Sequence, residues 1–236
     1  ILKGGTEFPK HRELVKGLWP LIGNSVFSAN GEDWENQRAM VNPAFAHTAL
    51  AKSMPLMVGA ADAFLERIDG MDRSRPIDVD PMMTHVAADI IFRTLFSQTL
   101  DLKRSAIIHK AFGRFQRLSH SASMLGLYGL PSRWFEKRSE QPAEAIREVF
   151  RPIVEARFDA FHAGEASEHK DILQSLVEAK HPETGAHFTF KELMDQVATI
   201  FLAGHETSAS TMTWALYLLA ECAHIQARAR AEVAEI

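Results

Sequence analysis

A run of about thirty helix-forming residues, from about Lys191 to Cys222, most constrains the fold of this chain. Gly204 interrupts the run, although glycine inside a helix costs about 1 kcal/mol relative to alanine. The hydroxyls of Thr207 and Ser208 can bond the carbonyls of the preceding turn and bend the helix there. An acid followed by a hydroxyl at such a point, as in Glu206 and Thr207, suits a proton relay to a bound ligand. A buried helix that packs closely at its glycine explains the same pattern.

The rest of the chain is also patterned for helices and predicts an all-α fold. Apolar residues recur at spacings of three and four in several segments, and Asp80-Pro81 supplies a cap and a first-turn proline for one of them. Glycine and proline mark residues 1–30 as short turns, and residues 119–134 read as an apolar loop between two helices. Besides the central helix, we expect helices over about residues 31–41, 48–68, 80–97, 101–118, 137–161 and 171–180, and a truncated one after 222.

The composition is that of an ordinary globular protein, with 46% hydrophobic and 24% charged residues and a formal net charge of -4. This balance gives no push toward nucleic acid, so we expect no nucleic-acid partner. No apolar run approaches the roughly 18 residues that span a membrane, and no signal peptide is present. We therefore expect a cytoplasmic protein. Membrane attachment stays open, because we also expect residues to be missing before Ile1.

Both ends of the sequence look cut. The chain begins with Ile1 rather than Met, and residues 226–236 are strong helix formers up to the last residue. We expect 1–236 to be a single partial domain, truncated at both ends.

A second pattern lies near the start of the chain, where Trp34 and Arg38 are four residues apart and share one side of a helix. Arginine offers a planar fork of donors to a carboxylate, and tryptophan offers an indole N–H and an apolar face. The pair could hold an apolar group with acidic arms. A helix packed by its tryptophan, with a solvated arginine, explains the same spacing.

Together these segments resemble the cytochrome P450 monooxygenases. Residues 203–208 fill every specified position of the family's Ala/Gly-Gly-x-Asp/Glu-Thr-Thr/Ser pattern in its oxygen-activating helix. Trp34-x-x-x-Arg38, followed by Asn-Pro-Ala-Phe at 42–45, is similar to the helix that contacts the haem propionates. The two motifs stand in the family's order, and the resemblance covers essentially the whole chain. It implies the N-terminal and central helical portion of the cytochrome P450 fold, with the family's β-sheets largely missing.

The resemblance implies haem as the cofactor. Trp34 and Arg38 would anchor its propionates, and Ala203 and Gly204 would line its distal face. Thr207 would hold the hydrogen-bond network of the iron-bound oxygen.

The resemblance also implies an activity: splitting O2 and inserting one oxygen atom into a hydrophobic small molecule. Glu206 and Thr207 would be the catalytic residues, with Glu206 delivering protons. Phe27, Val26 and Phe201 would bind the substrate. Electrons would come from NAD(P)H through a ferredoxin with its reductase or through a flavoprotein reductase. The apolar residues 119–134 fall where the family has its access lid.

The family's thiolate loop is not in this sequence. Cys222 lies in a helical stretch without the loop's flanking residues, so we expect a small packed thiol there and not an iron ligand. The eleven histidines show no metal-ligand spacing, so we expect no metal ligand within the chain. His205 fills the motif's unspecified position and could tune proton access, although a packed or surface histidine explains it better. The chain alone is therefore expected to be inactive. The rival interpretation is a non-catalytic all-α protein that binds a lipid or another helix.

Overall fold

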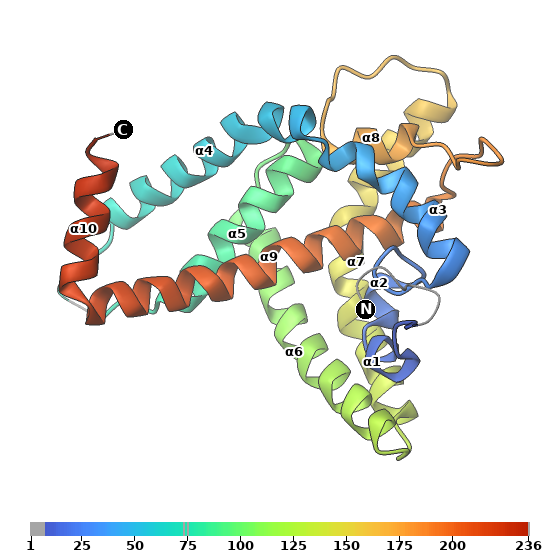
Figure 1. Ribbon diagram of the computed structural model, residues 1–236, viewed down its shortest axis with the longest axis horizontal. Coiled ribbons are helices and arrows are strands. Elements are labelled where there is room, and N and C mark those ends of the chain that lie inside the picture. The colour runs from blue at the N-terminus through green and yellow to red at the C-terminus, as the bar shows by residue number, and fades with distance from the viewer. Residues whose placement is uncertain (1–7, 73, 75, 236) are drawn as a thin grey trace.

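The computed structural model describes residues 8–72, 74 and 76–235, and these form helices and turns without a strand (Figure 1). The all-α prediction is confirmed. None of the described helices is both long and apolar enough to cross a membrane. The helices are α1 (Arg12–Lys16), α2 (Trp19–Ile22), α3 (Gly31–Val41), the 3-10 helix η1 (Asn42–Phe45), α4 (His47–Asp69), α5 (Val79–Phe96), α6 (Leu102–Leu127), α7 (Arg133–His162), α8 (Ile172–Glu178), α9 (Phe190–Glu221) and α10 (Ala223–Val233).

Helix α9 is the long element that the sequence predicted, and it runs across the whole molecule (Figure 1). A capping box starts it, because the Thr189 hydroxyl accepts the Glu192 N–H while the Glu192 carboxylate accepts the Thr189 N–H. Its first half is buried against α2, α5 and α7. Its second half leaves the body of the molecule and exposes large side chains such as Trp214 and Tyr217.

The core lies where α5, α7 and the first half of α9 meet. Phe92 and Phe96 of α5 pack edge to face at 4.8 Å, and Phe96 lies 5.7 Å from Phe150 of α7. Phe201 of α9 completes the cluster 4.8 Å from Phe150. Each of these four rings is at most 2% exposed. Burial of one such ring stabilises the fold by roughly 1.5–3 kcal/mol, so this cluster fixes α9 against the two helices behind it.

The predicted apolar loop at 119–134 is wrong. Helix α6 continues to Leu127 and α7 already begins at Arg133, so the connection is only residues 128–132. Ser119, Ala122 and Ser123 are buried on α6, where α1 packs against it. Tertiary packing therefore holds a segment helical although its serines favour helix ends and turns.

A smaller correction concerns the start of α5, where the cap is Asp78 and not Asp80. The Asp78 carboxylate accepts the N–H of Asp80 at 3.3 Å, and the helix begins at Val79. Pro81 thus lies inside the first turn, where a missing N–H costs nothing.

Gly204 is the point where α9 approaches α5 most tightly. A Cβ added at this glycine would meet the side chain of Ile91, with its Cγ1 atom only 2.8 Å away. A glycine in mid-helix costs about 1 kcal/mol, and here it lets the two helices pack closely.

We predict that Gly204→Ala lowers the free energy of unfolding by about 1–3 kcal/mol, because the added methyl overpacks the contact with Ile91. Gly113→Ala is the matched control within α6, since its Cβ would meet only the end of Arg117 at 3.8 Å. That change is expected to stabilise the fold by up to about 1 kcal/mol. Urea unfolding of both variants, and of Gly204→Ala in an Ile91→Ala background, measures the effect. Stabilisation by Gly204→Ala would contradict the packing argument.

Candidate functional site

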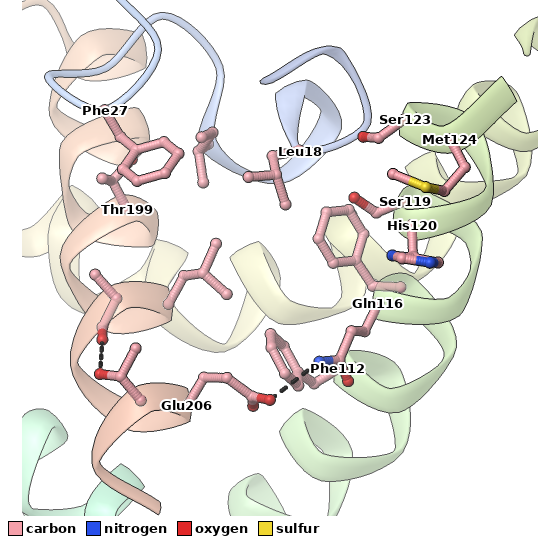
Figure 2. Close-up of a pocket in the computed structure, with 15 residues that line it drawn as sticks. Leu18, Phe27, Phe112, Gln116, Ser119, His120, Ser123, Met124, Thr199 and Glu206 are labelled. Carbon is pink, nitrogen blue, oxygen red and sulfur yellow. Dashed lines mark hydrogen bonds between the residues drawn. The ribbon is translucent and has the colours of Figure 1, made fainter. Parts of the chain in front are cut away.

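An apolar cavity of about 480 Å³ lies between α6, α9 and the segment that carries α2 (Figure 2). One wall is α9, which contributes Leu202 and Ala203 together with the Glu206–Thr207 pair. The segment around α2 contributes Leu18, Ile22 and Phe27. Phe112, Phe115, Gln116, Ser119, His120, Ser123 and Met124 come from α6. Segments distant in sequence thus enclose one space of the size of an organic molecule.

Four of the residues predicted for the site meet in this cavity: Phe27, Ala203, Glu206 and Thr207. Ala203 and Thr207 are exposed and Glu206 is half-buried, so all three offer their side chains to a ligand. Val26 lies in an adjoining depression that it shares with Phe27, Lys10 and Trp34. Their assigned roles stay predictions, but the side chains are where those roles need them.

The Thr207 hydroxyl is tied to its own helix. Its Oγ1 donates a hydrogen bond to the Ala203 carbonyl at 2.7 Å, the back-bonding expected of threonine in a helix. The hydroxyl proton is therefore committed to the backbone, and the oxygen's lone pairs remain to accept a hydrogen bond. We predicted a donor toward the ligand, and this geometry makes Thr207 an acceptor.

Glu206 reaches across the cavity to α6. Its carboxylate accepts a hydrogen bond from the Gln116 amide at 3.0 Å (Figure 2). This bond joins the acid of the predicted proton relay to the helix that forms the opposite wall. Sequence reasoning missed Gln116, because nothing in its local pattern indicates that α6 faces α9.

Phe201 is a correction, because it does not bind substrate from the cavity wall. It is 2% exposed and packs on Phe150 and on His205, whose ring stacks with it at 5.1 Å. At about 100° per residue it lies roughly 160° from Ala203 around the helix. Phe201 therefore belongs to the core behind α9. Gly204 likewise turns its open side toward Ile91 of α5, so the visible function of this glycine is helix packing.

His205 is enclosed between the rings of Phe112, 4.7 Å away edge to face, and Phe201. It is fully buried, and neither ring nitrogen has a hydrogen-bond partner. Burial disfavours the charged imidazolium and lowers the pKa of His205 to about 4, with nearby His109 acting in the same direction. His205 is thus a neutral core residue.

The helix α3, with Trp34 and Arg38, is joined to α9 by a buried glutamine pair. Gln196 is fully buried and donates a hydrogen bond to the Gln37 carbonyl at 2.7 Å. Its own side-chain oxygen accepts the N–H of Val26 at 3.1 Å. Gln196 thereby positions both the α3 helix and the segment that carries Phe27.

This junction lies on the cavity side of α9. Residues 196, 199, 203 and 207 are spaced by three and four and fall within about 80° of the helix circumference. Gln196 holds α3 at one end of this stripe, and Thr199, Ala203 and Thr207 line the cavity further along. The seven residues from 196 to 203 span about 10 Å of helix. Helix α3 and the acid–threonine pair therefore flank the same face of α9.

The donors of α3 are available. Arg38 is exposed, and its guanidinium makes no hydrogen bond or ion pair with any residue that the structure describes. Trp34 is 36% exposed, with the Lys10 ammonium 5.7 Å from its ring centre. A guanidinium and an indole beside an exposed small residue fit a flat apolar ring with carboxylate arms.

Asp195, the neighbour of Gln196, is a second anchor that sequence reasoning missed. It is 2% exposed, lies 2.8 Å from the Arg147 guanidinium, and accepts the N–H of Asn24 at 3.2 Å. Arg147 also donates to the Leu21 carbonyl at 2.8 Å. The available signal was a pair of adjacent polar residues in the apolar start of a buried helix, since buried polar groups are almost always hydrogen-bonded.

A helical body whose central helix bears an acid–threonine pair over an apolar cavity, beside a free tryptophan–arginine pair, defines a haem-binding oxygenase. The chain matches Cytochrome P450 over residues 2–236 and belongs to this family. Haem is the family's cofactor, and the donors of α3 together with small Ala203 fit it.

The similar proteins are of varied origin. The chain is 30% identical to cyclooctat-9-en-7-ol 5-monooxygenase of Streptomyces melanosporofaciens, with 99% of this chain and 48% of that protein aligned. It is 28% identical to a cytokinin hydroxylase of Arabidopsis thaliana, over 94% of this chain and 43% of the relative. The chain thus spans about half the length of the curated relatives it matches.

A solved structure shows the same fold. The crystal structure of the cytochrome P450DA heme domain superposes with a TM-score of 0.73 at 22% identity, covering 93% of this chain and 47% of that one. The predicted helical portion of the cytochrome P450 fold is confirmed.

We predict that His205 makes stability fall with acid. Its folded pKa of about 4 lies below the ordinary value of 6.5, so the unfolded chain binds the proton first. The unfolding free energy should therefore drop as pH falls from about 6.5 through 4, by up to about 3 kcal/mol. Urea unfolding at pH 7, 5.5 and 4 measures this against His205→Leu, which lacks the titrating group. Parallel pH profiles for the two proteins would contradict the assignment.

Proposed function

We propose that the protein containing this chain is a haem-thiolate monooxygenase that inserts one oxygen atom from O2 into an apolar organic molecule. One observation carries the proposal: Ala203, Glu206 and Thr207 share the wall of an apolar cavity, on the face of α9 where Gln196 holds α3. The printed names of the relatives, a monooxygenase, a hydroxylase and an 11-oxo-beta-amyrin 30-oxidase of Glycyrrhiza uralensis, support it. These relationships do not favour the rival lipid- or helix-binding protein.

Haem bound here would supply the redox chemistry that activates O2. Arg38 and Trp34 would hold its propionates through a charge-assisted hydrogen bond and an indole N–H. Ala203 would let the ring lie close to α9. Cys222 stays outside this arrangement at the end of α9, so the thiolate ligand is expected from residues outside this chain.

The two polar side chains of α9 would handle protons. Thr207 Oγ1, with its own proton on the Ala203 carbonyl, would accept a hydrogen bond from a ligand group and hold that group in place. Glu206, one residue earlier, would supply the proton as a general acid. Its tie to Gln116 must break or turn for that step, because the carboxylate points toward α6 in this structure (Figure 2).

The walls of the cavity suit a hydrophobic substrate, since most of the residues that line it are apolar. We propose NAD(P)H as the electron source, through a ferredoxin with its reductase or a flavoprotein reductase.

The proposal predicts a haem-thiolate spectrum. A haem-loaded protein that contains these residues, reduced and treated with CO, should show the Soret band near 450 nm that the family's thiolate ligation implies. Replacing Arg38 with Leu removes the free guanidinium and should lower the haem content measured by the pyridine haemochrome assay. A protein that takes up no haem would end this proposal.

We predict that Thr207→Ala uncouples electron use from oxygen insertion. Loss of the acceptor should lower product formed per NAD(P)H by about tenfold or more, while haem binding is kept. Thr213→Ala is the control, because that hydroxyl back-bonds to Ala209 at 3.0 Å and lies outside the cavity lining. Unchanged coupling in Thr207→Ala would contradict the assigned role.

A further inference from the structure

The α6 wall of the cavity carries a row of polar side chains. Gln116, Ser119, His120 and Ser123 are spaced as i, i+3, i+4 and i+7, so they share one face of the helix. All four line the cavity, and Figure 2 shows them along the wall opposite α9. The facing wall and the α2 segment are mainly apolar there, as with Leu202. The cavity therefore has one polar side and one hydrocarbon side.

Two of these four side chains lack a protein partner. Gln116 already donates to Glu206, and Ser123 has its own interaction. Neither the Ser119 hydroxyl nor the His120 imidazole makes a hydrogen bond with the residues that the structure describes. Ser119 is only 4% exposed, and its hydroxyl turns toward the cavity (Figure 2).

An unmatched hydroxyl at an apolar cavity has a chemical consequence. A purely hydrocarbon ligand would strip water from Ser119 and give nothing back, which costs about 1–3 kcal/mol for an unsatisfied polar group. A ligand hydroxyl can both donate and accept. Ser119 and a neutral imidazole at His120 offer a donor and an acceptor each, so the two residues can satisfy one alcohol completely.

We propose that the cavity binds an apolar molecule that already carries a hydroxyl, and that Ser119 and His120 bind that hydroxyl. This inference rests on the proposed function, because it names the substrate class of the same cavity. Since α6 and α9 are opposite walls, a ligand held by its hydroxyl at α6 presents its hydrocarbon end to Ala203 and Thr207. The polar row thus selects the ligand and sets its orientation.

The test compares cedrol, a sesquiterpene alcohol, with its hydrocarbon cedrane. Binding is measured by equilibrium dialysis with gas chromatography on haem-loaded protein that contains this chain. Cedrol should bind more tightly than cedrane. Ser119→Ala should weaken cedrol binding about fivefold, the value of one hydrogen bond, and leave cedrane binding unchanged. His120→Phe, which keeps an aromatic ring, should have the same selective effect.

Ser121→Ala is the matched control on the same helix. Its hydroxyl bonds to the Arg117 carbonyl at 2.9 Å and does not line the cavity, so both affinities should be unchanged. The cedrane measurement shows whether each variant keeps its cavity intact.

Equal binding of the two probes by the parent protein, binding of neither, or an equal loss for both probes in Ser119→Ala and His120→Phe would overturn the inference. Dialysis needs no turnover, so the two proposals fail separately. A protein that prefers cedrol but lacks the CO band would refute the monooxygenase and keep the hydroxyl site. A coupled monooxygenase without alcohol preference would refute only the hydroxyl site.

Discussion

Asp195 and Gln196 lie side by side in the buried first half of α9, and their hydrogen bonds locate the other parts of the site. Asp195 pairs with the Arg147 guanidinium of α7 at 2.8 Å and accepts the Asn24 N–H. Gln196 joins α9 to α3 and to the backbone of Val26. Removing one partner of a buried charged pair costs about 3–5 kcal/mol. The short N-terminal helices have little core of their own, so they depend on these contacts for their place beside the cavity.

Much of the fold followed from local patterns. The helix over 31–41 and the central helix were predicted within a residue or so of their bounds, because Gly31 and the Thr189–Glu192 capping box are strong local signals. The residues at 203–207 and the Trp34–Arg38 pair also stood out by spacing alone. The structure then placed both beside one face of α9, which spacing could not do. Their relation depends on Gln196, which links segments 159 residues apart.

The failures share a cause, which is that the neighbour of a helix face is not written in the helix. Phe201 and Gly204 were assigned to the ligand side, but Phe150 and Ile91 occupy the space in front of them. The serine-rich end of α6 read as a loop because its packing against α1 was not visible. Gln116 went unnoticed for the same reason, since only the position of α6 brings its amide to Glu206.

The back-bond of Thr207 has a consequence for timing. Thr199, Thr211 and Thr213 make the same bond four residues back, so the bond itself is a habit of this helix, and what sets Thr207 apart is an exposed oxygen on the cavity wall. A hydroxyl whose rotor is locked by its own backbone needs no reorganisation when a guest arrives. Its lone pairs are aimed in advance, and such preorganisation spares the entropy that a freely spinning hydroxyl would lose.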